Sequence, residues 1–154
     1  MEEIKRLVEK ILKNMTINDV RIEIKKDNSS KDKELLMVDI KISPHDAKYF
    51  LSENAVGLNS LQHLLKIFAF KHIAGQVFVV ADINGYKKER EKTLTDLAVK
   101  TAQKVRRTKK SIILEPMPAY ERRFIHLKLA ENPDIVTESI GEEPERKIVV
   151  RLYP

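Results

Sequence analysis

The residues with the clearest chemical potential are Arg122 and His126, which stand four positions apart. In a helix this spacing places both side chains on one face. Arginine offers a planar fork of five N–H donors that suits a phosphate group, and histidine can stack on a base or donate to a backbone oxygen. The same spacing equally fits an arginine beside a histidine that helps to hold the fold. The pair alone therefore leaves a nucleic-acid contact and a structural role open.

Residues typical of common enzymatic centres are missing or dispersed. Cysteine is absent, which removes disulfides, thiolate nucleophiles and cysteine-based zinc sites. The four histidines, at positions 45, 63, 72 and 126, are never four apart, so no two can hold a metal from one helix. The four glycines are scattered and form no phosphate-binding loop, and no isolated pair of carboxyl groups suggests acid–base chemistry. We expect a protein that is not an enzyme and binds neither cofactor nor metal.

Positive charge is concentrated in the second half of the chain. The 154 residues carry a net charge of +6, with 13 basic and 12 acidic residues in 1–83 and 16 basic and 11 acidic residues in 84–154. Residues 87–110 alone contain ten Lys or Arg against three Asp or Glu. A polyanion would bind here first, although a solvated helix face explains the run as well. The basic side chains that charge alone singles out are Lys100, Lys104, Arg106, Arg107 and Arg146.

Hydrophobic periodicity predicts the order helix, strand, strand, helix, helix, strand for the first half. Apolar residues spaced i, i+3, i+4, i+7 indicate helices, and strict alternation indicates half-buried strands. Ser43-Pro44 is typical of a helix start. The predicted elements begin with a helix over 2–14 and strands over 20–25 and 36–42, which a polar hairpin loop over 26–34 joins. A short helix over 45–51 follows, and then a longer helix that ends at Gly75 and has Leu58, Leu61, Leu65 and Phe68 on one face. A buried strand over 77–83 completes this half.

The second half has a different predicted order. After an Asn84-Gly85 turn, a long helix runs to about Arg107, with Lys100, Lys104 and Arg107 on one face. A short strand over 111–114 ends at two prolines, and a second helix runs from Tyr120 to about 130. In that helix we expect Tyr120, Phe124 and Leu127 to form the core edge, which makes packing a better role for Tyr120 than base stacking. Strands over 135–138 and 147–152 complete this half.

Longer stretches of the second half carry a family resemblance. Residues 115–127, EPMPAYERRFIHL, contain the Arg122–His126 pair, and residues 141–150, GEEPERKIVV, follow it. With these stretches the chain resembles the bacterial Jag family, also called KhpB. Weaker matches at Asn84-Gly85-Tyr86 with Arg90, at 105–108, at 58–62 and at 77–83 extend the resemblance over essentially the whole chain.

The resemblance implies an α+β fold of two small α/β-sandwich domains. Residues 1–83 would form a type II, bacterial KH-like domain of order α-β-β-α-α-β, which periodicity predicts independently. Residues 84–154 would form an R-3-H (Arg-x-x-x-His) domain, with helices packed on a short mixed sheet. Both are modules that bind single-stranded nucleic acid. We expect the chain to lack the additional N-terminal domain of many family members.

One departure from the family pattern concerns the loop with which KH domains clamp a nucleic-acid backbone. That loop is Gly-x-x-Gly, because only glycine permits so close an approach. Aligned on residues 58–62, its place here is taken by Ser52-Glu53-Asn54-Ala55, unless Val56-Gly57 shifts the register. Both glycines are missing, and Glu53 brings a negative charge. A KH fold that serves as a scaffold or dimer surface is therefore at least as well supported as a working clamp.

We expect an RNA-binding protein whose main contact lies in the second domain. Arg122 and His126 are the family's motif residues, Arg123 is a further phosphate contact, and the five basic side chains listed above assist electrostatically. The resemblance implies a cytoplasmic post-transcriptional regulator of single-stranded RNA, or single-stranded DNA, linked to the cell envelope, division or sporulation. It also implies a KH-mediated homodimer, or a heterodimer with a small KH protein, without membrane insertion. The alternative is a protein-interaction scaffold that dimerises through the KH domain and has no RNA ligand.

Overall fold

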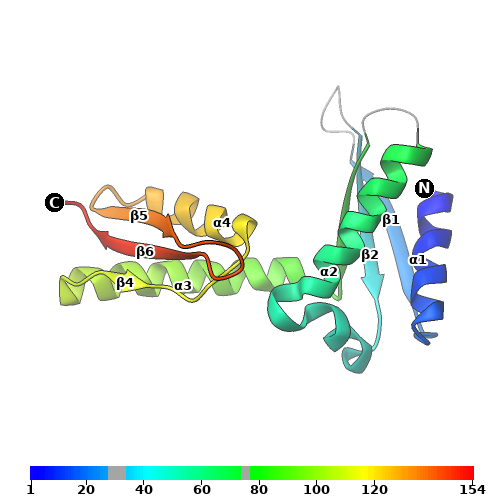
Figure 1. Cartoon of the computed structure of the whole chain (residues 1–154), viewed down its shortest axis with the longest axis horizontal. Helices are drawn as coiled ribbons and strands as arrows, with labels where there is room; N and C mark the ends of the chain where they lie inside the picture. Colours follow the sequence, from blue (N-terminus) through cyan, green and yellow to red (C-terminus); the bar gives the residue numbers. More distant parts are fainter. Residues whose placement is uncertain (28–33, 74–76) are drawn as a thin grey trace. The chain divides into compact units, whose positions relative to one another are not determined.

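The structure is a computed structural model that describes residues 1–27, 34–73 and 77–154 (Figure 1). The chain divides into two compact units, Met1–Lys87, here called unit 1, and Lys88–Pro154, called unit 2. Most of the predicted hairpin loop and the helix end predicted at Gly75 lie outside the described residues. Among the residues described, no helix combines the length and hydropathy needed to cross a membrane. The mixed α+β class predicted from sequence is confirmed.

Unit 1 is a three-stranded sheet with helices on one face. Its elements are α1 (Glu2–Asn14), β1 (Arg21–Asp27), β2 (Glu34–Lys41), α2 (Pro44–His72) and β3 (Val77–Ile83). The strand order is β1-β2-β3, in which β2 pairs antiparallel with β1 and parallel with β3. The parallel pair is possible because α2 provides the crossover between β2 and β3.

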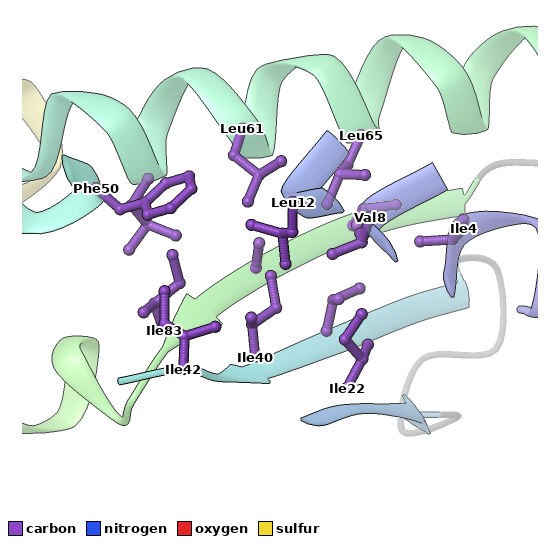
Figure 2. Packing of buried hydrophobic residues seen from close by; sticks show 14 of the residues in the cluster. Ile4, Val8, Leu12, Ile22, Ile40, Ile42, Phe50, Leu61, Leu65 and Ile83 are labelled. Carbon is purple, nitrogen blue, oxygen red and sulfur yellow. The ribbon is translucent and has the colours of Figure 1, made fainter. Parts of the chain in front are cut away.

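The core of unit 1 is formed by the inward positions of the alternating strands. Ile22, Ile40 and Ile83 are buried on the sheet, and α1 covers them with Ile4, Val8 and Leu12. Figure 2 shows Leu61 and Leu65 of α2 directed at the same strands. The helix predicted over 2–14 is confirmed, because α1 spans these residues and its buried stripe follows the i, i+4, i+8 series.

Helix α2 is two helical segments joined by a sharp turn, as the sequence predicted. Ser43 caps the first segment by accepting a hydrogen bond from the backbone N–H of Asp46 at 3.1 Å. The interruption is Ser52, which is extended, followed by three residues in the left-handed region, Glu53, Asn54 and Ala55. The two segments approach closely at Gly57, where a Cβ atom would lie 2.5 Å from the backbone oxygen of Tyr49. Gly57 is therefore a packing glycine, since any side chain there would force the two segments apart.

The end of unit 1 lies beyond its last strand. The side-chain amide of Asn84 pairs with the backbone N–H and C=O of Ile42, both at 3.0 Å, much as a further strand residue would. Lys87 donates to the side-chain oxygen of Gln62 at 2.7 Å, and burial lowers the pKa of this lysine. These contacts attach the turn and the first helical residues to unit 1, which extends to Lys87.

Unit 2 is a second three-stranded sheet with helices on one face. Helix α3 (Tyr86–Thr108) runs into it from the end of unit 1, followed by β4 (Ile112–Ile113), α4 (Ala119–Ala130), β5 (Ile135–Ile140) and β6 (Lys147–Leu152). All strands are antiparallel, in the order β4-β6-β5, so β6 is central. The expected mixed sheet is therefore wrong for this unit, because both outer strands run opposite to β6. The core combines Leu94 and Val105 of α3 with Ile125 of α4 and Ile148 and Val150 of β6.

The predicted buried face of α4 is wrong. Tyr120 and Leu127 are exposed and Phe124 is only partly buried, whereas the buried positions are Glu121, Arg122, Ile125 and Leu129. The helix is rotated about its axis relative to the prediction, because polar side chains in its first two turns bind partners on neighbouring elements. Two charged residues and two aliphatic residues therefore face inward. A prediction based only on the spacing of apolar residues selects the wrong face of the helix.

Candidate functional site

The Arg122 side chain is buried, and two of its guanidinium nitrogens donate hydrogen bonds. Its Nε donates to the backbone oxygen of Met117 at 3.1 Å, and its Nη2 donates to the carboxylate of Glu143. Met117 belongs to the proline-bounded segment before α4, and Glu143 to the turn between β5 and β6. The Arg122 side chain is 8% exposed and that of Glu143 is 57% exposed. The solvent-facing partner of Arg122 is thus a single carboxylate.

His126 is held between two hydroxyl groups of β5. Its Nδ1 lies 2.7 Å from the Thr137 hydroxyl, and its Nε2 lies 2.8 Å from the Ser139 hydroxyl. These residues are two apart, so they share the inward face of β5 with the buried Ile135. Burial lowers the pKa of His126, and the positive charge of Arg122 lowers it further. The imidazole therefore stays neutral, with one nitrogen donating and the other accepting.

Together the two residues attach α4 to β5 and to the β5–β6 turn. The structural role left open by the i, i+4 spacing is therefore realised in this structure. The backbone of Arg146 contacts the segment before α4, because the Met117 backbone N–H donates to the Arg146 backbone oxygen at 3.3 Å. Among the described residues the Nε of Arg146 is buried without a hydrogen-bond partner. The site thus contains a buried arginine held by one exposed carboxylate.

Comparison with known proteins identifies the family. The model of the R-3-H domain matches residues 92–152, which run from α3 to β6. The chain is 34% identical over 134 residues to the RNA-binding protein KhpB of Clostridium symbiosum, covering 87% of this chain and 59% of the relative. The chain belongs to a Jag/KhpB-like family. Two further relatives are also named RNA-binding protein KhpB. That of Lactiplantibacillus plantarum is 41% identical, and the match covers 62% of this chain and 30% of the relative. That of Bacillus subtilis is 36% identical, and the match covers 71% of this chain and 53% of the relative.

The chain spans about three fifths or less of the length of these curated relatives. The R-3-H match covers the Arg122–His126 pair and the strand whose hydroxyl groups hold the histidine. The resemblance stated from sequence is therefore confirmed.

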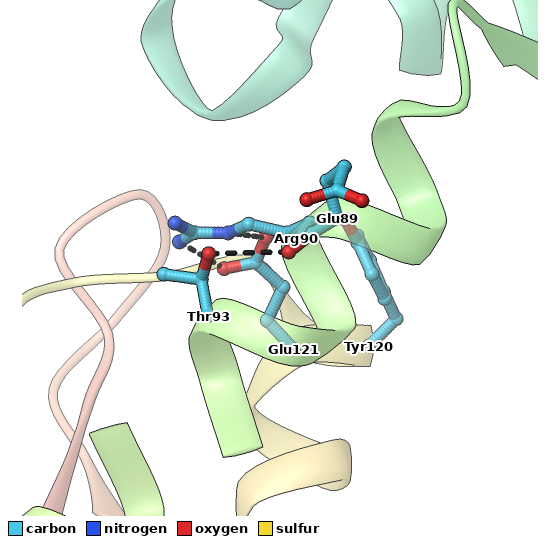
Figure 3. Close-up of polar contacts among 5 residues, drawn as sticks. All are labelled: Glu89, Arg90, Thr93, Tyr120 and Glu121. Atoms are coloured by element: carbon cyan, nitrogen blue, oxygen red, sulfur yellow. Dashed lines mark hydrogen bonds and ion pairs between the residues drawn. The ribbon is translucent and has the colours of Figure 1, made fainter. Parts of the chain in front are cut away.

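Glu121 is a residue of the R-3-H domain that sequence reasoning missed. It is completely buried, and Arg90 of α3 donates to it twice, from Nε at 2.7 Å and from Nη2 at 2.8 Å. Figure 3 shows this pair with the Tyr120 ring beside it, and the Tyr120 hydroxyl donates to Glu121 at 3.2 Å. The pair joins α3 to the first turn of α4. Its only signal in the sequence was the i, i+4, i+8 spacing of Glu121, Ile125 and Leu129, which a search for apolar residues overlooks.

The predicted basic residues of the R-3-H domain fall into two groups. Arg123, Lys100, Lys104 and Arg107 are exposed, and within the described part of the chain their side chains make no ion pair. Arg106 is already engaged, because it donates to both carboxylate oxygens of Asp134, at 2.6 and 2.7 Å, and to Asn132 at 2.7 Å. That pair raises the pKa of Arg106 and lowers the pKa of Asp134. Arg106 therefore ties the end of α3 to the residues before β5.

The predicted degenerate loop of unit 1 is the turn inside α2. Ser52, Glu53 and Asn54 are exposed, and Ala55 is buried. The Ser52 hydroxyl is used locally, since it donates to the Lys48 backbone oxygen at 2.6 Å. The loop thus presents an exposed carboxylate at Glu53, and Gly57 is occupied in the contact between the two helical segments. A register shift onto Val56-Gly57 is not needed to explain this glycine.

The described residues of the two units offer no site for a metal. Within residues 1–27, 34–73 and 77–154 no three His, Cys, Asp or Glu side chains gather closely enough to hold a metal ion. A groove between α3 and α4 is lined by Lys88, Lys92 and Lys128 but also by Glu91, Asp96 and Phe124. Its charges are mixed, so the groove shows no clear preference for an anion.

Proposed function

We propose that this Jag/KhpB-like chain binds single-stranded RNA, mainly through the R-3-H domain of unit 2, without catalysing a reaction. The observation that carries the proposal is the contact between Arg122 and Glu143. A phosphate group resembles a carboxylate in charge and in its ability to accept two parallel hydrogen bonds from arginine. An RNA phosphate would replace Glu143 on Arg122.

The β5–β6 turn beside Arg122 is acidic, but exposed basic side chains elsewhere in unit 2 favour an extended polyanion. Arg123 is exposed next to Arg122, and the unpaired basic side chains of α3 add positive charge in the same unit. The curated relatives are named RNA-binding proteins. We extend this name to a cytoplasmic post-transcriptional regulator, with residues 1–83 as a KH-like domain and residues 84–154 as the domain that binds single strands.

The test is a fluorescence anisotropy titration with a labelled, mixed-sequence single-stranded RNA. Arg122→Lys keeps the charge but removes the fork, and we expect it to weaken binding at least about tenfold, the scale of a lost bidentate contact. Because Arg122 is buried, Arg123→Ala serves as a variant that cannot disturb the core, and Arg21→Ala, an exposed arginine of unit 1, is its control. The double variant Arg122→Ala with His126→Ala is less informative, because it also removes contacts that hold α4.

A salt series makes this test decisive. Specific binding should persist at about 0.15 M salt, whereas adventitious attraction to a polyanion falls steeply with ionic strength. The proposal fails if the wild-type chain shows no saturable binding at that ionic strength, or if both substitutions in unit 2 behave like Arg21→Ala.

A second proposed function is association through unit 1 with another KH-type chain, either a second copy or a small KH protein. Leu64, Ile67 and Phe70 project from one side of α2 and are 52%, 40% and 88% exposed. The exposed carboxylate of Glu53 in the turn disfavours a phosphate there, which leaves protein association as the better use of this unit. Phe70→Lys should convert an associated species to monomer in sedimentation, whereas Leu127→Lys, at a 62% exposed position in unit 2, should not. A wild-type monomer at micromolar concentration would overturn this second function.

A further inference from the structure

The sheet of unit 2 has one face that its own helices leave uncovered. Ile148 and Val150 of β6 are fully buried beneath the helices. Because side chains alternate along a strand, Lys147, Val149 and Arg151 lie on the opposite face. In unit 2, all of whose residues are described, both α3 and α4 contribute to the buried cluster on the inner face. The outer face is therefore open within this unit.

Strand register shows which side chains meet on the outer face. Val149 lies between Ile113 of β4 and Glu138 of β5, and Arg151 lies opposite Val136. Ile113 is 58% exposed, an unusual position for an isoleucine in a strand. Continuing the alternation of β6 brings Tyr153 to the same face, where it is 68% exposed. The face thus carries apolar and aromatic side chains together with Arg151 and the exposed carboxylate of Glu138.

One end of this face is basic, and Asp134 organises it. The Tyr153 backbone N–H donates to the Asp134 backbone oxygen at 2.8 Å, and the Asp134 carboxylate holds Arg106. The positive charge of Lys109, which directly follows the last residue of α3, also lowers the pKa of Asp134. Lys110 lies two residues before β4. At the other end, the β5–β6 turn carries Glu142, Glu143 and Glu145, so the two ends of the sheet have opposite charge.

We propose that the basic end of this face, formed by Ile113, Val149, Arg151 and Tyr153, is a second contact surface for single-stranded RNA. Unpaired bases would stack on the Tyr153 ring and the Arg151 guanidinium plane, and Lys109 and Lys110 would neutralise the adjoining phosphates. Charge complementarity favours this ligand over a protein partner, because Arg151, Lys109 and Lys110 are basic and Asp134 is already paired with Arg106, which leaves Glu138 opposite Val149 as the acidic group of the surface. The inference rests on the proposed RNA binding and extends it beyond the Arg122–His126 helix.

Tyr153 allows a sharp test. Its attachment to Asp134 uses only backbone atoms, so Tyr153→Ala leaves that hydrogen bond intact. Base–aromatic stacking predicts that Tyr153→Ala weakens binding of a labelled mixed-sequence single-stranded RNA at least about fivefold. Tyr153→Phe, which keeps the ring, should bind like the wild type. Tyr49→Ala removes a tyrosine of almost equal exposure, 66%, from unit 1 and is the matched control.

The outcomes separate this inference from the proposed function. If the wild type binds RNA, Arg123→Ala weakens binding and Tyr153→Ala does not, the second surface is refuted while the R-3-H function stands. If the wild type does not bind RNA, both proposals fall. Weakening by Tyr153→Ala that Tyr153→Phe restores supports the surface. If Tyr153→Ala instead changes only the sedimentation of the chain, the face is a protein interface and the inference is overturned.

Discussion

The carboxylate of Glu121, fully buried in α4, is neutralised by two hydrogen bonds from Arg90, which lies 31 positions earlier in α3. This bidentate pair carries a charge into the interior of unit 2 and fixes the start of α4 against α3. The Arg122 that follows it is thereby held at the position from which it reaches Met117 and Glu143.

Removing Arg90 should destabilise unit 2 strongly. Arg90→Ala leaves the Glu121 carboxylate buried without its cation, which costs about 3 to 5 kcal/mol in comparable pairs. Urea unfolding followed by circular dichroism measures the loss. Lys92→Ala, which breaks the exposed pair with Glu89, should cost less than about 1 kcal/mol. Equal effects from the two variants would contradict the structural importance of the buried pair.

Glu143 should compete with RNA for Arg122. Glu143→Gln removes the negative charge from the exposed partner of Arg122, so we expect RNA to bind roughly threefold to tenfold more tightly, as for the loss of one charge-assisted contact. Anisotropy titrations measure the change, with Glu142→Gln as control because it removes the same charge from the neighbouring position. If both variants gain the same affinity for RNA, the change in net charge explains the effect, and specific competition at Arg122 is refuted.

The lowered pKa of His126 should make unit 2 less stable in mild acid. The unfolded chain takes up a proton near pH 6.5, whereas the folded chain resists protonation until a lower pH. The free energy of unfolding should therefore fall as the pH drops through 6.5 and continue to fall down to the pKa of the folded state. His126→Gln should remove this dependence between neutral pH and that lower limit, and His63→Gln, at an exposed position of unit 1, should retain it. A wild-type stability that does not change in this interval would argue against burial of a neutral imidazole.

The same substitution should have opposite effects at two glutamates. Glu53 has a φ of 51°, which costs an L-residue about 1 kcal/mol, so Glu53→Gly should leave the free energy of unfolding unchanged or raise it. In the exposed interior of α1, Glu9→Gly should lower it by about 1 kcal/mol. Thermal unfolding of both variants tests the difference. A destabilisation at Glu53 as large as that at Glu9 would show that the turn relies on the glutamate side chain.

Periodicity predicted most elements of the fold because the strands and helices bury regular stripes. The helix over 2–14 and the strand over 77–83 match their observed bounds, and the break in α2 was foreseen from the apolar pattern on either side. The strand predicted over 111–114 shrinks to Ile112–Ile113. The proline-rich segment that follows it leaves little room for pairing.

The orientation of α4 could not be read in this way. Its inner face contains Glu121 and Arg122, whose burial depends on partners at positions 90 and 143, far away in the sequence. His126 is likewise explained by Thr137 and Ser139, which only the pairing of β5 with the rest of the sheet brings beneath the helix. Polar burial is set by tertiary partners, and single-chain periodicity does not record them.

The turn in α2 has a consequence for redesign of unit 1. Ser52 is exposed and its backbone is extended, so a glycine there loses only a local hydrogen bond. At Ala55, glycine would give up one buried methyl group, worth about 0.8 kcal/mol, while relieving a left-handed backbone that costs about as much. A Gly-x-x-Gly clamp could therefore be built into this position with little loss of stability. The fold of unit 1 is therefore compatible with such a clamp. A variant that carries this loop could be used to measure how much a Gly-x-x-Gly turn contributes to binding of a nucleic-acid backbone.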